Sequence, residues 1–268
     1  MGKFTDKVVW ITGSSSGIGE ATAYEFAREG ARLILTALEA DLLKKVAARC
    51  KELGAPDAKP LPFDLSKKDE VAGLAEQAWQ VYGHIDVFYN NAGISQRGTT
   101  CETEMRVINK VMDINWFAPV IMTKVILPKM VENGGGQLMV TTSINGRFGF
   151  PLRCAYSSSK HALYGFFETV QAEYYKDNIR VTIVCPGRVQ TRISFYALEK
   201  DGKQHAKMDA GQAGGCTPEQ AARKIVKAVY KKKREVLAHN PGKKRLIYTI
   251  SSSFPGLCAR IARSIDPM

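Results

Sequence analysis

A tyrosine and a lysine lie four residues apart in the stretch CAYSSSKHALYG, Cys154 to Gly165. Residues at this spacing share one face of a helix, so the Lys160 amine can stand beside the Tyr156 phenol. A neighbouring ammonium favours the phenolate and lowers the phenol's pKa from its usual value of about 10. A phenol adjusted in this way can exchange a proton with a developing alkoxide at neutral pH. Taken alone, the stretch is also typical of a surface helix with serines at its start, so the rest of the chain decides.

Three glycines follow the first apolar run of the chain. Gly13, Gly17 and Gly19 lie in ITGSSSGIGE, between the run Val8–Thr12 and an amphipathic segment that begins at Gly17. Glycines at such a turn let the backbone approach a phosphate closely, and the amide groups at the helix start then face the anion. The spacing is not that of a Walker A loop, because no Gly-Lys-Ser/Thr closes it. The turn predicts a dinucleotide site.

Apolar runs and amphipathic stretches take turns along the whole chain, which predicts βαβ units and a doubly wound parallel sheet. The runs do not alternate with polar residues, as expected for strands buried on both faces. No repeat or linker divides residues 1–268, so we expect one α/β domain. We expect strands at Val8–Thr12, Arg32–Ala37, Leu61–Phe63, Ile85–Asn90, Gln137–Thr142, Arg180–Cys185 and Glu235–His239.

Two segments lack this pattern. Residues 195–217 are rich in Gly, Gln and Lys and show little periodicity, so we expect a mobile substrate loop over about residues 191–217. The tail, residues 240–268, is both basic and apolar. It is expected to pack over the site or on a partner subunit, and a membrane surface is the alternative.

Composition narrows the class of protein. The 268 residues carry a formal net charge of +12, which we interpret as a solubility feature rather than a nucleic-acid surface. The six cysteines are scattered without a CxxC, so we expect free thiols, no zinc site and no other metal site. The N-terminus has no signal-peptide pattern, and no apolar stretch approaches the length of a membrane span. A cytoplasmic protein is expected.

Several further motifs occur in a fixed order. Asn90–Gly93 reads NNAG, Asp64 follows the third expected strand, Asn115 lies in a long helix, Ser143 follows the fifth strand, and Pro186 precedes Gly187. With the glycine turn and Tyr-x-x-x-Lys, this order resembles the short-chain dehydrogenase/reductase family over essentially the whole chain. The resemblance implies a Rossmann-like, seven-stranded parallel sheet with helices on both faces. It also implies a homodimer or homotetramer and an NAD(P)-dependent oxidoreductase that interconverts a ketone and a secondary alcohol.

The resemblance also assigns roles to residues. Asn115, Ser143, Tyr156 and Lys160 would be catalytic: Ser143 would hold the carbonyl oxygen, Asn115 would position a water next to Lys160, and Lys160 would also reach the nicotinamide ribose. The residues expected to bind the cofactor are Thr12, Gly13, Ser15, Ser16, Gly17, Ile18, Gly19, Thr36, Leu38, Asp64, Leu65, Asn91, Ala92, Gly93, Tyr156, Lys160, Pro186, Gly187, Val189 and Thr191.

The end of the second strand should select between NAD and NADP. An acidic residue there is typical of NAD binding in this family and a basic one of NADP binding, but the chain has Ala37 and Leu38. Glu39 could reject a 2′-phosphate or bond a ribose hydroxyl, or it could simply begin the next helix. Thr36 could bond to a phosphate oxygen. The wider likeness to NADP-using reductases favours NADP(H) over NAD(H).

The expected substrate pocket is apolar. It would be formed by residues 95–98 and 144–150, by Arg153 and Cys154, and by the loop after Thr191, which fits a hydrophobic ketone or alcohol. Arg147 or Arg153 could instead recognise an acidic group, and a 3-oxoacyl-carrier-protein reductase is therefore an alternative.

Three other classes of protein share parts of this sequence pattern. A sugar-nucleotide epimerase would carry a different glycine spacing and a larger C-terminal domain, and a serine hydrolase would need a Gly-x-Ser-x-Gly turn that this chain lacks. A non-catalytic NAD(P)-binding protein stays an alternative, although the tyrosine and the lysine that such proteins often lose are both present.

Overall fold

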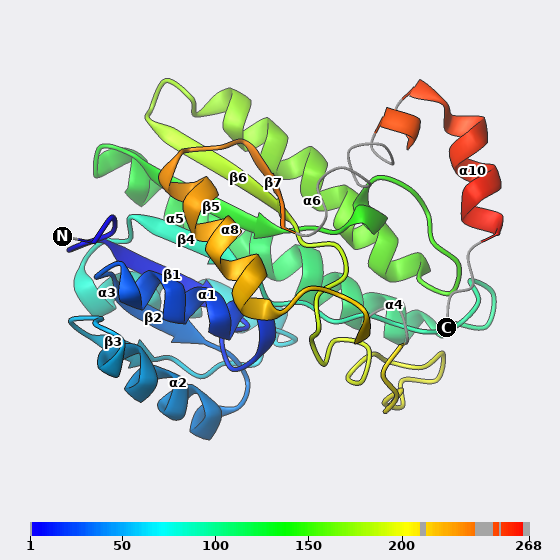
Figure 1. Cartoon of the computed structure of the whole chain (residues 1–268), viewed down its shortest axis with the longest axis horizontal. Helices are drawn as coiled ribbons and strands as arrows, with labels where there is room; N and C mark the ends of the chain where they lie inside the picture. The colour runs from blue at the N-terminus through cyan, green and yellow to red at the C-terminus, as the bar shows by residue number, and fades with distance from the viewer. Residues whose placement is uncertain (1, 210–212, 239–248, 252, 265–268) are drawn as a thin grey trace.

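A single parallel sheet organises the chain in a computed structural model that describes residues 2–209, 213–238, 249–251 and 253–264. Its strands are β1 (Val8–Thr12), β2 (Arg32–Thr36), β3 (Ala58–Pro60), β4 (Val87–Asn90), β5 (Gly136–Thr141), β6 (Ile179–Cys185) and β7 (Glu235–Leu237). Their order is β3-β2-β1-β4-β5-β6-β7, and every neighbouring pair is parallel (Figure 1). The predicted Rossmann-like, seven-stranded sheet is confirmed.

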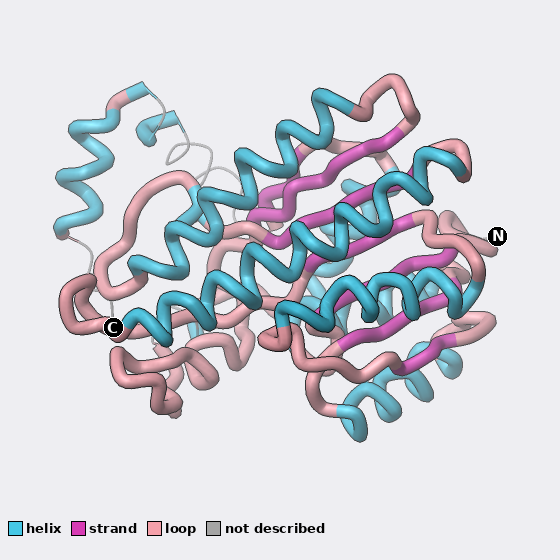
Figure 2. Tube along the Cα trace, turned by 180° about the vertical axis from the view of Figure 1, so that it is seen from behind, coloured by secondary structure: helices cyan, strands magenta, loops and turns pink. Residues whose placement is uncertain are grey.

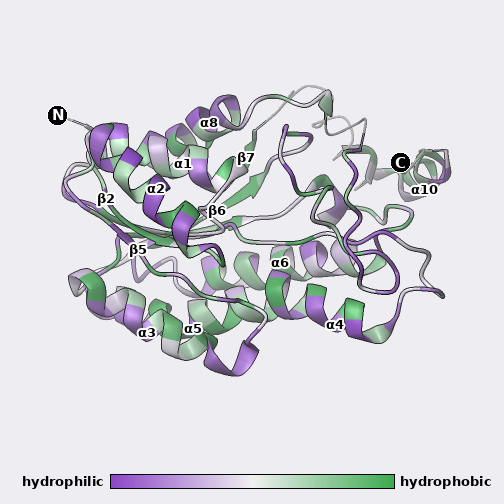
Figure 3. Ribbon diagram, turned by 90° about the horizontal axis from the view of Figure 1, so that it is seen from below, coloured by the Kyte–Doolittle hydropathy of each residue, from purple (hydrophilic) through white to green (hydrophobic). Residues whose placement is uncertain are grey.

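Helices cover both faces of the sheet. The helices α1 (Gly17–Arg28), α2 (Ala40–Glu52) and α8 (Pro218–Tyr230) lie on one face (Figure 3). On the other face lie α3 (Val71–Tyr82), α4 (Met105–Met112), α5 (Ala118–Glu132) and α6 (Cys154–Glu173), which Figure 2 shows from behind. The helix α10 (Pro255–Arg263) stands at the periphery.

Side chains of β1 alternate between two hydrophobic cores. Val9 and Ile11 belong to the core beneath α1, α2 and α8, whereas Val8 and Trp10 belong to the core beneath α3, α5 and α6. All four are fully buried, which explains why the strand reads as a continuous apolar run. Two-sided burial fixes the register of the central strand and thereby the position of the glycine turn that follows it.

Two predicted strands are corrected by the structure. The third strand is Ala58–Pro60 rather than Leu61–Phe63. The backbone amides of Leu61 and Phe63 still donate to β2 and its end, at 2.7 and 2.9 Å. The prolines at positions 60 and 62 alternate with these donors and face away from β2, which an edge strand tolerates. The seventh strand ends at Leu237, and His239 lies outside the described residues.

The segment predicted as a mobile loop is anchored instead. Leu198 forms backbone bridges with Gln96 and with Gln204, and Val189 forms one with Cys216. Asp209 in the same segment contacts buried arginines. Backbone pairing and ion pairs therefore substitute for the apolar periodicity that the sequence lacks.

In the described part of the tail, Ala262 and Arg263 of α10 line a cavity together with residues 149–152 and the start of α6. The expectation that the tail packs over the site or on a partner subunit stays a prediction.

One continuous helical segment contradicts the expectation about apolar length. α4, a π-helical turn at Asp113–Phe117 and α5 together form Met105–Glu132, 28 residues that are long and apolar enough to cross a membrane. Met122, Ile126 and Met130 are fully buried in the core beneath the sheet. Core helices of soluble proteins pass the same test, so the segment is weak support for a membrane span.

Two glycine-to-alanine substitutions test the packing of the turn. A Cβ at Gly19 would lie 2.1 Å from the Gly13 carbonyl oxygen, whereas one at Gly73 in α3 would meet nothing within 4 Å. We expect Gly19→Ala to lower the free energy of unfolding by about 2 kcal/mol, because backbone must move. Gly73→Ala, the control, should raise it by up to about 1 kcal/mol through helix propensity. Urea unfolding measures both, and equal effects would contradict the packing described here.

Candidate active site

The carboxyl ends of β1, β4 and β5 open into one cavity. The glycine turn follows β1, Asn91–Gly93 follow β4, and Thr141 ends β5. Because parallel strands all end at the same edge, residues distant in the sequence meet there, as at the ligand crevice of open α/β sheets. The start of the substrate loop closes the other side of the cavity with Thr191, Arg192 and Ile193.

The glycine turn offers a cradle of backbone. Gly13 has φ +64°, and a Cβ there would lie 2.8 Å from the Ala92 Cα. Gly17, with φ +61°, begins α1 and would bring a Cβ to 3.1 Å from the Thr191 methyl group. Only glycine fits both the space and the left-handed conformation. The open backbone amides at the start of α1 fit the pyrophosphate of a dinucleotide.

Most of the predicted cofactor residues line this cavity. Those that do are Gly13, Ser15, Ser16, Gly17, Ile18, Leu38, Asp64, Leu65, Asn91, Ala92, Gly93 and Thr191. The predicted residues outside its lining are Thr12, Gly19, Thr36, Tyr156, Lys160, Pro186, Gly187 and Val189. The structure thus brings twelve of the predicted residues together at one cavity, and their roles in cofactor binding stay predictions.

Thr12 and Thr36 show the difference between lining and supporting residues. The Thr12 hydroxyl accepts hydrogen bonds from the backbone amides of Asn91 and Ala92, both at 3.1 Å, and so joins β1 to the end of β4. The Thr36 hydroxyl accepts from the Trp10 indole at 2.9 Å and is fully buried. The expectation that Thr36 bonds to a phosphate oxygen is wrong, because that hydroxyl already serves the core.

Lys160 is buried at the end of β5. Its side chain is 2% exposed, and its Nζ donates to the Thr141 carbonyl oxygen at 2.8 Å and lies 5.7 Å from the Tyr156 ring centroid. Burial lowers the pKa of Lys160 to about 7. The amine therefore changes its charge near neutral pH, unlike an exposed lysine.

Tyr156 faces Ser143 and the lysine. Burial raises the pKa of Tyr156, while the hydrogen bond with the Ser143 side chain and the charges of two arginines lower it to a smaller extent. The expectation that Lys160 brings this pKa below its usual value is therefore not met here. The cause is burial of the phenol itself, which disfavours the phenolate more than the hydrogen bond and the arginine charges favour it.

Asn115 lies in the π-helical turn of the long helix and is fully buried. Its amide exchanges hydrogen bonds with the backbone of Ile94, at 2.8 and 2.9 Å, and donates to the Ser159 hydroxyl at 3.1 Å. A Cβ on Gly93 would lie 3.2 Å from the Asn115 Oδ1 and 3.3 Å from the Lys160 Nζ. Asn115 and Lys160 thus flank the same glycine, as a shared role requires. Local π-helical insertions are frequent at functional sites.

Sequence reasoning missed several residues of the site. Thr141 contributes a backbone carbonyl, which any residue type could supply, so no sequence signal marks it. Gln96 was expected in the substrate pocket, but its contact was not: its side chain accepts from the Tyr156 amide at 3.4 Å, across sixty positions of sequence. The cavity residues that were not predicted to bind the cofactor are Ala37, Glu39, Phe63, Ile94, Ile114, Thr141, Arg192, Ile193 and Tyr196.

Comparison with known sequences agrees with this geometry: residues 7–201 match the family described as short chain dehydrogenase. This chain belongs to the short-chain dehydrogenase family. A relative from Anopheles gambiae, Dehydrogenase/reductase SDR family protein 7-like, is 40% identical over 86% of this chain and 74% of its own length. A relative from Bos taurus, Dehydrogenase/reductase SDR family member 7B, is 38% identical over 96% of this chain and 80% of its own length.

Solved structures of the short-chain dehydrogenase family share the fold. An alcohol dehydrogenase from Thermococcus sibiricus, complexed with 5-hydroxy-NADP, is 27% identical with a TM-score of 0.75, covering 88% of this chain and 97% of its own. A short chain dehydrogenase/reductase from Burkholderia phymatum, in complex with NAD, is 22% identical with a TM-score of 0.80. It covers 100% of this chain and 98% of its own, and this likeness supports the fold alone. Both neighbours hold nicotinamide dinucleotides.

The pKa of Lys160 predicts how stability depends on pH. Its folded value, about 7, lies below its ordinary value of 10.5, so between about pH 7 and pH 10.5 the unfolded chain binds up to one more proton here than the folded chain. The free energy of unfolding should rise over this window, and the gain should be absent below about pH 7, where both states are protonated. Lys160→Met should flatten the rise in denaturant titrations. The exposed Lys124→Met is the control, and an unchanged slope in Lys160→Met would contradict the burial.

Proposed function

We propose that the protein is an NAD(P)-dependent oxidoreductase that interconverts a hydrophobic ketone and a secondary alcohol. One observation carries the proposal: the Tyr156 phenol, the Ser143 hydroxyl and the Lys160 amine converge beside a cavity with a glycine turn that fits a dinucleotide. Membership of the short-chain dehydrogenase family supports the reaction class. A non-catalytic binding protein would not need a phenol and an amine desolvated together.

Each of these side chains has a defined task in this proposal. When bound, the cofactor supplies or accepts a hydride. The Ser143 hydroxyl donates to the substrate oxygen. Its hydrogen bond with Tyr156 keeps the two hydroxyls close enough for both to reach that oxygen. The Tyr156 Oη then gives its proton to that oxygen as negative charge develops on it, or takes the proton back in the oxidation direction.

Lys160 controls the charge around the phenol. Within the part of the chain that the structure describes, its amine donates a hydrogen bond only to the Thr141 carbonyl, and burial lowers its pKa to about 7. An anionic dinucleotide in the adjoining cavity would favour the ammonium and raise the pKa of Lys160. The ammonium would then favour the Tyr156 phenolate, which is the effect that the cofactor-free site lacks. Proton transfer would thereby be coupled to cofactor binding.

The expected substrate class rests on aromatic side chains of the segments around the site, of which Tyr196 lines the cavity. Phe148 and Phe150 lie close together, at 6.4 Å between ring centroids, and Phe195 packs edge-on against Tyr196 at 5.3 Å. Such rings favour an apolar ketone or alcohol. The cytoplasmic location and the homodimeric or homotetrameric assembly stay predictions.

NADP(H) in preference to NAD(H) is part of the proposal. The complex of the Thermococcus sibiricus alcohol dehydrogenase with 5-hydroxy-NADP supports it. Glu39 opposes it, since its carboxylate lines the cavity and accepts from the Ser15 hydroxyl at 2.9 Å. A negative charge there disfavours a 2′-phosphate. The residues around Glu39 therefore deserve the first test of cofactor choice.

Tyr156→Phe tests the assigned proton donor. We expect turnover of an aryl or alkyl ketone to fall by about 100-fold or more, because the general acid is removed. Cofactor affinity, measured by fluorescence titration, should change little. The exposed Tyr175→Phe serves as the control. Unchanged turnover in Tyr156→Phe would discard the assignment of this residue.

Leu38→Arg tests where the 2′ end of the cofactor lies. Leu38 is 63% exposed and lines the cavity, so an arginine there could pair with a 2′-phosphate. We expect the Kd for NADPH to fall by about 10-fold, with the Kd for NADH nearly constant. The control is Leu42→Arg, an exposed position one turn further along, outside this cavity. Equal effects of the two variants would mean that only overall charge matters.

A further inference from the structure

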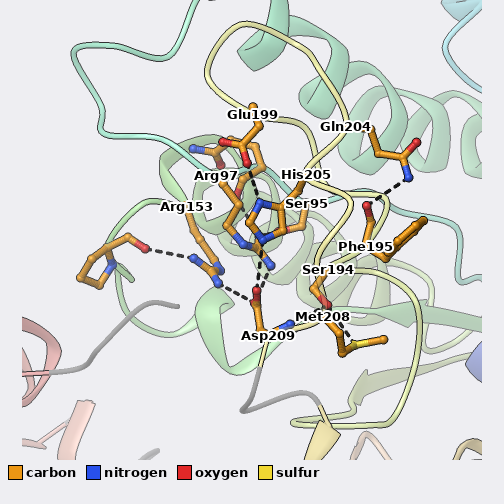
Figure 4. A network of polar contacts seen from close by, with 12 residues as sticks. Ser95, Arg97, Arg153, Ser194, Phe195, Glu199, Gln204, His205, Met208 and Asp209 are labelled. Carbon is orange, nitrogen blue, oxygen red and sulfur yellow. Dashed lines mark hydrogen bonds and ion pairs between the residues drawn. The ribbon is translucent and has the colours of Figure 1, made fainter.

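A network of buried charges joins the segment after β4 to the substrate loop, residues 191–217 (Figure 4). Arg97 and Arg153 donate to the same oxygen, Oδ2 of Asp209, at 2.7 and 2.9 Å. The two arginines are only 5% and 7% exposed. Two guanidinium groups from separate parts of the chain therefore converge on one carboxylate of the loop.

This convergence lies close to the proposed proton donor. Arg153 precedes Tyr156 by three residues, and the charges of Arg153 and Arg97 both lower the pKa of the Tyr156 phenol against the effect of burial. The backbone next to Arg97 is tied to the same helix, since the Gln96 Oε1 accepts from the Tyr156 amide. A group bound by the two arginines would thus sit near a ketone that is held at Tyr156.

Asp209 satisfies Arg97 incompletely. A guanidinium usually grips a carboxylate or phosphate through two N–H groups and two oxygens. Here one oxygen serves both arginines, while Oδ1 of Asp209 faces the His205 Nε2 at 3.5 Å. The Arg97 Nη1 donates to Ser95 and Gln96, but its Nε is buried without a partner among the described residues. A buried donor without a partner is unfavourable, so an anion with more accessible oxygens would satisfy Arg97 better than Asp209 does.

We propose that Arg97 and Arg153 bind an anionic group of the substrate, a carboxylate or phosphate joined to the ketone by a short chain, and that Asp209 occupies this site in its place when the substrate loop is closed. The inference rests on the proposed function and narrows its substrate class. Buried guanidinium groups without an anion are costly, which gives the loop carboxylate a reason to be there. The substrate anion would displace Asp209 and release that end of the loop.

The test compares matched ketones in the full-length protein with saturating cofactor. The probes are a nine-carbon γ-keto acid, its uncharged methyl ester, and the phosphate monoester of the matching keto alcohol. Arg97→Met should raise the KM for the charged ketones by about 10- to 100-fold, as expected for a lost charged hydrogen bond, and should leave the ester nearly unaffected. Asp209→Asn should lower the KM for the charged ketones, because the internal competitor is neutralised. The better of the two charged probes identifies the anion.

The network of Arg97, Arg153 and Asp209 could also serve only to fasten the substrate loop, and the same variants distinguish this role from anion binding. If Asp209 only fastens the loop, both variants will impair the ester and the charged ketones equally, and the proposal is overturned. Arg106→Met is the matched control, because the exposed Arg106 donates to the Asp201 carbonyl of the same loop but does not contact Asp209. Arg106→Met should not discriminate between the charged ketones and the ester.

Two further outcomes keep the inference distinct from the proposed function. If no ketone is reduced, the proposed function fails, whereas reduction of the ester with no preference for charged ketones overturns the anion site alone. Binding without turnover is measured by thermal stabilisation with inorganic phosphate, which should be larger for Asp209→Asn than for the native protein. If Arg97→Met does not fold, Arg97→Lys takes its place, because it keeps the positive charge but loses the paired N–H donors of the guanidinium. It should still raise the KM for the charged ketones selectively.

Discussion

Desolvation of the Lys160 amine is the constraint on which the proposed chemistry depends. The amine is buried at the end of β5 with a backbone carbonyl as its acceptor, and its pKa falls to about 7. A lysine in water would be permanently charged and would need no cofactor to set its state. Burial converts the residue into one whose charge responds to an anion in the neighbouring cavity. The raised pKa of Tyr156 then describes the protein before the cofactor binds.

The parallel sheet makes this burial possible. Its strand ends bring the glycine turn, the Asn91–Gly93 segment and Ser143 to one edge, while α6 lays Tyr156 and Lys160 across it. The π-helical turn places Asn115 against the same Gly93. The substrate loop completes the enclosure, and its Asp209 places a carboxylate among arginines. The cofactor cavity, the proton donor and the substrate loop thus lie next to one another at the carboxyl edge of the sheet.

The sequence predicted the parts of the protein that local pattern determines. Fully apolar strands, the glycine turn and the four-residue spacing of Tyr156 and Lys160 are visible in single stretches, and the resemblance supplied their order. It could not predict the net pKa of Tyr156, which depends on burial summed over the whole fold. Nor could the sequence pair Arg97 with Asp209. The two residues lie 112 positions apart, and Asp209 belongs to a segment without apolar periodicity. Thr36 was misassigned because its bond to Trp10 links two strands through their side chains.

The most direct test of the account is an NMR titration of the Lys160 amine in protein with labelled lysine, assigned with Lys160→Met. The account predicts a pKa near 7 without cofactor and a marked rise when NADPH or NADH is bound. Titration at the ordinary lysine value of about 10.4 in both states would contradict it. That result would mean that the amine is hydrated and cannot couple cofactor binding to the Tyr156 phenol.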